Sequence, residues 1–173
     1  MDSKDINSKI DIKIAQDENI VNLNLIAEEF LELIDDFNIN FINNKYFILT
    51  AYLNNNLAGI LIAENKIHKI DSLEKLIPKV SIYLLYVNAT FRNNHIGKKL
   101  LNTFLQIQKS RGIASVYIEL PQKYLKGIEF FKRNNFLQVS KDKNKIILEI
   151  NLWNDYGIRD DDIIENSFND VFH

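Results

Sequence analysis

The segment from Val80 to Leu120 constrains the fold more than any other part of the chain. Val80–Val87 is a near-continuous β-prone run, which predicts a strand buried on both faces in the middle of a sheet. Ala114–Leu120 predicts a second buried strand. Between them, helical spacing predicts a helix that ends at Arg111-Gly112, where glycine is suited to a C-terminal cap; one face of this helix comprises Ile96, Leu100, Leu101, Phe104, Leu105 and Gln108. This order of strand, turn, helix and strand predicts two parallel strands of one sheet.

The segments before this unit predict a strand, a helical region and a hairpin. Ile10, Ile12 and Ile14 alternate with polar residues, which is typical of a half-buried strand. Helical spacing predicts one or two helices between Asp17 and Asn43. Tyr46–Leu53 and Leu57–Glu64 are joined by three asparagines, which tolerate the left-handed backbone of a tight hairpin.

The segments that remain predict a loop, a helix and a second hairpin. We expect a loop over Asn65–Lys79 with a short helical turn at Ser72–Leu76, and a helix that begins at Pro121 and ends at Asn134. Phe136–Ser140 and Lys145–Leu152 predict the final hairpin. The expected order is β, α, β, β, β, α, β, α, β, β.

Composition indicates one domain and excludes several classes of site. A chain of 173 residues at 46% hydrophobic is long enough for one full core, which we place at residues 1–152 with an extension at 153–173. A net charge of −2 provides no positive field to hold nucleic acid or an anionic membrane, and neither is expected as a partner. The absence of cysteine excludes disulfides, thiolate metal sites and a cysteine nucleophile, and with three histidines we expect no metal. No apolar run approaches the roughly 18–20 residues of a membrane span, so we expect a cytoplasmic protein.

The turn between Asn88 and Lys99 carries the chemistry of the chain. The start of a helix exposes backbone N–H groups without intrahelical partners, and the helix dipole adds positive charge, so a phosphate is favoured there. Gly97 lets a ligand approach the backbone closely. Lys98 and Lys99 oppose the dipole unless an anion is present, which supports an anion site. A strand, turn and helix with one glycine and some lysines is nevertheless common in α/β proteins.

Two patterns in this part of the chain resemble a known family. Leu85-Tyr86-Val87 followed by Arg92 to Lys98 resembles the signature of the GNAT acetyltransferases, which is a strand ending L-x-V and then R/Q-x-x-G-x-G/A at a helix start. Gly127 to Phe136 is similar to the family's second pattern, A-x-x-F-Y-x-x-x-G-F. The resemblance covers Ile82 to Val139.

The resemblance implies an α/β (α+β) fold with a mixed, mostly antiparallel sheet of about seven strands flanked by helices. The sheet would open after the fourth strand, with acetyl-CoA in the gap. Leu85 and Val87 would pair through their backbones with the pantetheine arm, and the Val87 N–H would polarise the thioester carbonyl. The pyrophosphate would be held by the Arg92 side chain and by the backbone N–H groups of the residues that follow it: Asn93, Asn94, His95, Ile96, Gly97 and Lys98.

Departures from the family pattern affect catalysis most. His95 and Asn135 stand where the family has glycines, and Phe131 stands where it has a tyrosine that protonates the leaving thiolate. The strand Val80–Val87 also lacks the carboxylate that many members use as a base. Two candidates for these roles are Tyr124 as the acid and Glu119 as a base acting through water. Packing for Tyr124, and a solvated strand end for Glu119, are the ordinary alternatives.

The resemblance implies transfer of an acetyl group from acetyl-CoA to a primary amine by direct attack. The alternative is a catalytically weak or inactive acyl-CoA-binding domain. A nucleotide-binding module unrelated to coenzyme A is disfavoured because the chain lacks G-x-x-x-x-G-K-[ST]. The acceptor, whether small molecule or protein, is not identified by the sequence, and a homodimer is compatible with the family without being indicated by any residue.

Overall fold

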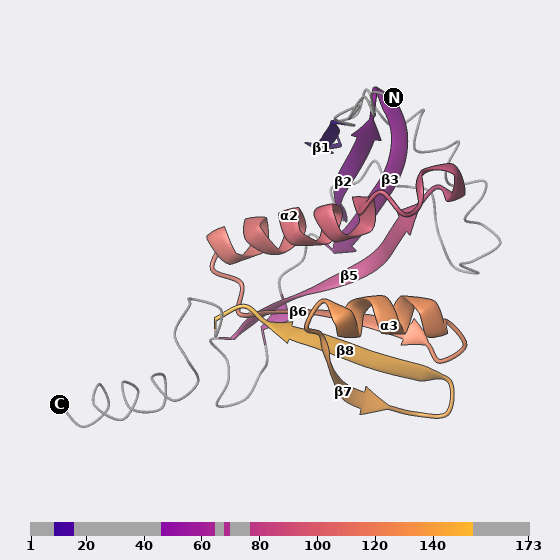
Figure 1. Cartoon of the computed structure of the whole chain (residues 1–173). Helices are drawn as coiled ribbons and strands as arrows, with labels where there is room; N and C mark the ends of the chain where they lie inside the picture. Colours follow the sequence, from indigo (N-terminus) through magenta and orange to yellow (C-terminus); the bar gives the residue numbers. More distant parts are fainter. Residues whose placement is uncertain (1–8, 16–45, 65–67, 70–76, 154–173) are drawn as a thin grey trace. The chain divides into compact units, whose positions relative to one another are not determined.

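The computed structural model describes residues 9–15, 46–64, 68–69 and 77–153 (Figure 1). The strands lie in the order β1-β2-β3-β5-β6-β8-β7, with β4 paired to β5, and form a mixed, mostly antiparallel sheet. The predicted fold class is therefore confirmed. The described elements are β1 Ile10–Ile14, β2 Tyr46–Leu53, β3 Asn56–Glu64, β4 His68–Lys69, β5 Pro78–Val87, the 3-10 helix η2 Ala89–Phe91, α2 Ile96–Ser110, β6 Ser115–Pro121, α3 Leu125–Arg133, β7 Leu137–Lys141 and β8 Lys145–Asn151.

The chain divides into two compact units. The first comprises residues 1–67 and 81–104, and the second comprises residues 68–80 and 105–173. The division passes through β5 and through α2, so each of these elements contributes one part to each unit.

The strands of the first unit are joined by the predicted asparagine hairpin. Antiparallel pairing joins β1 to β2, β2 to β3, and β3 to the last part of β5. Asn54 and Asn55 have φ values of 50° and 67°, which is the left-handed conformation that a two-residue hairpin turn requires at both positions. The predicted hairpin is therefore confirmed. Asparagine suits these positions because it is one of the few residues that tolerate this conformation.

Helix α2 lies across one face of the first unit's sheet (Figure 1). The rings of Phe47 on β2 and Phe104 on α2 lie 5.9 Å apart between centroids, and Phe104 has no exposed surface. Gly59 on β3 makes close packing possible, because a Cβ there would lie 2.9 Å from the carbonyl oxygen of Tyr86 and 3.1 Å from the side chain of Ile96. The start of α2 thus packs directly on the sheet.

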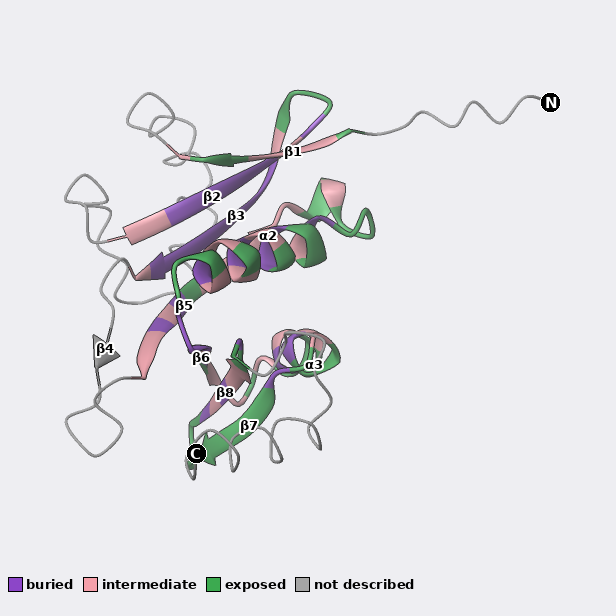
Figure 2. Cartoon of the chain, turned by 90° about the vertical axis from the view of Figure 1, so that its left-hand side faces the viewer, coloured by how far each residue is buried: buried purple, intermediate pink, exposed green. Residues whose placement is uncertain are grey.

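The second unit is built on β6, β8 and β7. β8 pairs antiparallel with both of the other strands, and β4 pairs with the first residues of β5. α3 buries Ile128 and Phe131, whereas every residue of β7 is exposed (Figure 2). β7 therefore forms an exposed edge of this unit's sheet.

Three predictions about elements are wrong in detail. β5 begins at Pro78, and it is not buried on both faces because the Tyr83 side chain is 49% exposed. Part of the predicted loop over Asn65–Lys79 forms the short strand β4. Pro121 ends β6 instead of opening a helix, since it lies opposite Lys145 of β8, and α3 begins at Leu125.

Some predictions fall outside the described residues. These are the helices over Asp17–Asn43, the helical turn at Ser72–Leu76 and the extension beyond Trp153. Within the described part of the chain, no helix is long and apolar enough to cross a membrane.

Candidate functional site

The turn between β5 and α2 is held by its own hydrogen bonds. Asn88 receives the Thr90 N–H on its side-chain oxygen at 3.0 Å and so caps η2. Its own N–H donates to the Ala58 carbonyl of β3 at 2.8 Å. The Asn94 amide donates to the Phe91 carbonyl at 3.0 Å. These bonds fix the path of the backbone from the strand to the helix.

Two residues of the turn have left-handed backbone conformations. Asn93 has a φ of 69° and His95 has a φ of 59°. Alternation between right-handed and left-handed residues turns successive N–H groups toward one point and forms a concave anion-binding site. His95 occupies the position where the GNAT pattern has glycine, and it keeps the conformation that glycine favours. Histidine and asparagine are the residues besides glycine that adopt it most readily.

The first turn of α2 supplies further N–H groups. The first hydrogen bond within the helix runs from Lys99 N–H to His95 O at 3.0 Å. Ile96, Gly97 and Lys98 come before Lys99 in the chain, so their N–H groups have no acceptor within the helix. No acidic residue lies in this turn, and the Lys98 and Lys99 side chains are exposed. The N-terminal end of α2 is thus positive in both its dipole and its side chains.

Strand β5 presents an edge of backbone groups beside this turn. In an antiparallel pair, residues alternate between those that bond to the partner strand and those whose N–H and C=O point away from it. The bond from Asn88 to Ala58 fixes which residues of β5 bond to β3. Leu85 and Val87 are the alternate residues, so their backbone groups point to the edge of β5 away from β3. In the strand order, β6 is the neighbour of β5 on that side.

Arg92 folds back over the end of β5. Its Nε–H donates to the Val87 carbonyl at 3.1 Å, and its guanidinium carbon lies 5.8 Å from the centre of the Tyr86 ring. Four of the five guanidinium N–H groups are not used in this bond. The positive charge of Arg92 is therefore fixed where the strand meets the turn.

Comparison with known proteins decides the family. The sequence matches the model of the "Acetyltransferase (GNAT) family" over residues 14–136, which is most of the chain. The chain belongs to the GNAT acetyltransferase family. No curated protein matches the sequence. The GNAT match includes the turn, both sequence patterns and strands β2 to β6.

Solved GNAT structures share the fold at low sequence identity. The PaiA N-acetyltransferase of Thermoplasma acidophilum, solved with coenzyme A, is 19% identical with a TM-score of 0.65, and the match covers 83% of this chain and 99% of that one. NAA60 of Arabidopsis thaliana, solved with acetyl-CoA, is 16% identical with a TM-score of 0.70 over 83% of this chain and 98% of that one. The ribosomal-protein-S18-alanine N-acetyltransferase of Escherichia coli is 14% identical with a TM-score of 0.63 over 83% and 94%.

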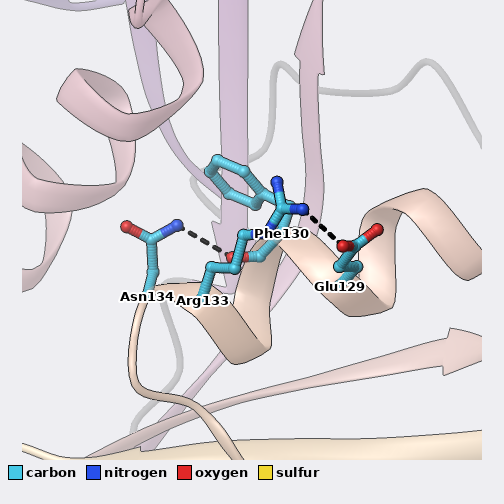
Figure 3. Close-up of polar contacts among 4 residues, drawn as sticks. All are labelled: Glu129, Phe130, Arg133 and Asn134. Atoms are coloured by element: carbon cyan, nitrogen blue, oxygen red, sulfur yellow. Dashed lines mark hydrogen bonds and ion pairs between the residues drawn. The ribbon is translucent and has the colours of Figure 1, made fainter.

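The second GNAT pattern forms the end of α3 (Figure 3). The Asn134 amide donates to the Phe130 carbonyl at 2.8 Å, and Arg133 pairs with Glu129 one turn earlier. Asn135, which replaces the family's glycine, has a φ of 70° and so keeps a glycine-like conformation as His95 does. The helix end therefore retains its shape despite the substitution.

Phe131 lies inside the core of the second unit. Its side chain is 3% exposed, and its ring packs edge-on against Phe130 at 5.3 Å and Phe136 at 5.0 Å between centroids. Phe136 is buried with it, whereas Phe130 is only half-buried. The Phe131 ring carries no proton donor, so the family's acid is missing at this position.

The two catalytic candidates lie in the second unit, whereas the predicted cofactor residues all lie in the first. The Glu119 carboxylate lies 2.8 Å from the Lys145 ammonium, and this hydrogen-bonded contact raises the pKa of Lys145. Tyr124 caps α3 through its backbone, and the Lys123 ammonium lies 5.5 Å from the centre of its ring. Both roles stay predictions.

Sequence reasoning missed two features of the site. The side-chain cap at Asn88 could have been predicted from the sequence, because asparagine commonly accepts a hydrogen bond from the backbone N–H two residues later. The β-bulge at Tyr83 could not have been predicted from a local sequence pattern, because it depends on the register of β5 against β3. Among the described residues, no group of three or more His, Asp or Glu side chains is placed to hold a metal.

Proposed function

We propose that this protein transfers an acetyl group from acetyl-CoA to a primary amine. The observation that carries the proposal is the turn after β5, where left-handed residues at 93 and 95 precede three helix N–H groups without intrahelical acceptors. A pyrophosphate satisfies such donors, and the lysines of the first turn of α2 complement its charge. The donor set of the turn fits coenzyme A.

The cofactor would be bound by the residues expected from the family. Backbone N–H groups from Asn93 to Lys98 would hold the pyrophosphate, with the free N–H groups of Arg92 beside them. Leu85 and Val87 would pair with the amides of the pantetheine arm, since their backbone groups face the edge away from β3.

The direction of β5 refines where the thioester would lie. An arm anchored at the turn passes Val87 before it reaches Leu85, because Leu85 lies two residues farther from the turn. The thioester is at the far end of the arm. We therefore propose the Leu85 N–H, in place of the Val87 N–H, as the donor that polarises the thioester carbonyl.

The reaction needs a base and an acid but no covalent intermediate. The amine nitrogen attacks the carbonyl carbon, the C–N bond forms, the C–S bond breaks, and the thiolate leaves and takes up a proton. We propose that Glu119 accepts the proton of the amine through water and that Tyr124 protonates the thiolate. The Lys145 ammonium lies 2.8 Å from the Glu119 carboxylate and would hold it in place.

A second function is a coenzyme A-binding domain with weak or no transferase activity. The burial of Phe131 favours it, because the ring fills the position of the family's acid without supplying a proton. Both functions predict binding of acetyl-CoA, and only the transferase predicts turnover.

Thermal melting and a release assay test these proposals in sequence. A ligand at about a hundred times its Kd adds about 2.7 kcal/mol to stability, which for a chain of this size corresponds to a rise in Tm of about 5–10 °C. We expect this rise with acetyl-CoA and none with ATP. No rise at millimolar acetyl-CoA refutes both functions. Release of free coenzyme A with any amine in a panel of small amines, polyamines and peptides then excludes the inactive domain.

A further inference from the structure

The positive charge of the chain is concentrated in one part of the second unit. Residues 123–145 carry seven lysine and arginine residues against two acidic residues, a net charge of +5, whereas the whole chain has a net charge of −2. All seven cationic side chains are exposed. A local concentration of charge of this kind attracts polyanions that the net charge of the whole chain would repel.

Five of these cations belong to two segments that meet at the tip of the β7–β8 hairpin. The backbone N–H of Gln122 donates to the Asn144 carbonyl at 2.8 Å, and the Gln122 side chain donates to the Asp142 carbonyl. These bonds hold the residues just before α3 beside the tip, so both segments contribute lysines to one surface. We call this group the tip cluster, and it consists of Lys123, Lys126, Lys141, Lys143 and Lys145.

Acidic groups at the tip neutralise only part of this charge. Glu119 pairs with Lys145 at 2.8 Å. The Asp142 carboxylate accepts the backbone N–H groups of Asn144 and Lys145 and so is engaged in the turn. The other four lysines of the tip cluster make no ion pair with a described residue. Five lysines and two carboxylates leave the tip with a net charge of +3.

An apolar side chain lies within the same surface. Leu125, between Lys123 and Lys126, is 73% exposed. A surface that combines several cations with an exposed leucine is complementary to a segment in which acidic and apolar residues are adjacent. Residues 160–164 of this chain have that composition, with three aspartates followed by two isoleucines. Residues 154–173 as a whole carry six acidic residues and one arginine, a net charge of −5.

The point of attachment lets these aspartates reach the tip cluster. Trp153 is eight residues from Lys145, so their Cα atoms are at most about 29 Å apart. Residues 160–162 are seven to nine residues beyond Trp153 and can extend about 23–32 Å from it. A short tether of this kind gives an effective concentration of about 1 mM. A contact with a Kd of about 0.1 mM is then formed about nine-tenths of the time.

We infer that Asp160, Asp161 and Asp162 dock on the tip cluster and cover it against nucleic acids and other polyanions. Charge complementarity and the tether favour this occupant over a separate polyanion, which has no such effective concentration. The inference does not depend on the proposed acetyl transfer.

Zero-length cross-linking of the dilute full chain tests the contact. A carbodiimide activates a carboxylate, and an ammonium in contact with it displaces the activating group to form an amide. At low ionic strength, mass spectrometry should find residues 160–162 linked to the tip cluster at least tenfold more than to Lys98, which is equally classed as exposed. Equal yields at Lys98, or no links to the tip cluster, overturn the inference. Links that join labelled to unlabelled chains in a mixture also overturn it, because the segment then binds a second copy.

A charge exchange tests whether the contact is electrostatic. Lys126→Glu with Lys143→Glu should reduce the yield at the remaining lysines of the tip cluster about tenfold. Adding Asp161→Lys and Asp162→Lys should restore links between the two segments, because the opposite charges have exchanged places. Lys98→Glu with Lys132→Glu is the matched control for charge and should leave the yield unchanged. A similar loss in this control, or no restoration by the exchange, contradicts docking on the tip.

Binding of a fluorescent oligouridine strand measures whether the surface is covered. If the aspartates cover it nine-tenths of the time, replacing all three with asparagine should tighten RNA binding about tenfold at low salt. Replacing Asp155, Glu165 and Asp170 with their amides removes the same charge and should change RNA affinity less than about threefold. Equal affinity of the wild type and the 160–162 variant, or no binding by either, overturns the inference. Equal and tight binding identifies nucleic acid as the occupant instead.

Discussion

Replacing His95 isolates the backbone conformation of the turn from the chemistry of its side chain. His95 has a φ of 59°, and the proposed role of this residue uses its backbone N–H alone. His95→Gly removes the imidazole and keeps the conformation, because glycine adopts it freely. His95→Val also removes the imidazole, but a β-branched residue disfavours a positive φ strongly. The two variants therefore differ mainly in backbone strain.

The expected magnitudes follow from the cost of the left-handed conformation. For a residue with a Cβ this cost is about 1–2 kcal/mol. In His95→Gly the relief of strain is offset by about 0.5–1 kcal/mol from the greater freedom of glycine in the unfolded chain, so stability should change little. With the same glycine offset, His95→Val should be less stable than His95→Gly by about 0.5–1.5 kcal/mol, which lowers Tm by about 1–6 °C.

Binding of acetyl-CoA should separate the variants further. A relaxed turn in His95→Val no longer directs its N–H groups to one point, and we expect at least a tenfold loss of affinity, equivalent to about 1.4 kcal/mol. His95→Gly should bind as the wild type does. Calorimetry on both proteins measures this difference. If His95→Val binds as well as His95→Gly, the turn is not the anion site; if His95→Gly loses affinity, the imidazole itself is a ligand.

Four further predictions address the site and its supports. Gly97→Glu should abolish acetyl-CoA binding through bulk and like-charge repulsion with Tm little changed, and retained affinity would place the pyrophosphate elsewhere. Gly59→Ala should lower stability by about 1–3 kcal/mol, because its Cβ would lie 2.9 Å from the Tyr86 carbonyl oxygen; an unchanged Tm would contradict this packing. Phe131→Tyr should lower Tm without raising turnover, since the ring is 3% exposed, whereas faster release of coenzyme A would show that a missing acid limits the reaction. Two backbone N–H groups in the β7–β8 turn lower the pKa of Asp142, so its contribution to stability is present above the unfolded pKa and is lost as pH falls through the lower folded pKa. Asp142→Asn should weaken the loss of stability with acid, and an unchanged acid limb in thermal melts would refute this role.

Local chemistry made part of the fold predictable. The hairpin at Asn54 and Asn55 follows from the tolerance of asparagine for a left-handed backbone. The same argument applies to His95 and Asn135, which appear in the sequence as losses of the family's glycines. Both have a positive φ, so the residue types already indicated that the conformation is retained.

Features that depend on pairing between strands were not predictable. Pro121 favours the first position of a helix, but pairing of β6 with β8 overrides this preference and ends the strand there. The outward backbone groups of Leu85 and Val87, and the bulge at Tyr83, depend on which residues of β3 lie opposite. This register cannot be predicted from the local sequence of β5, and a shift of one residue would reverse which backbone groups face the partner strand.

The most direct test of the central claim is the response of backbone amides to coenzyme A, measured by nuclear magnetic resonance on the labelled full chain. The claim predicts the largest shifts at the N–H groups from Asn93 to Lys98, with smaller shifts at Leu85 and Val87. Saturating coenzyme A that leaves the turn's amides unshifted, or moves amides elsewhere more strongly, would contradict the claim that this turn binds the pyrophosphate.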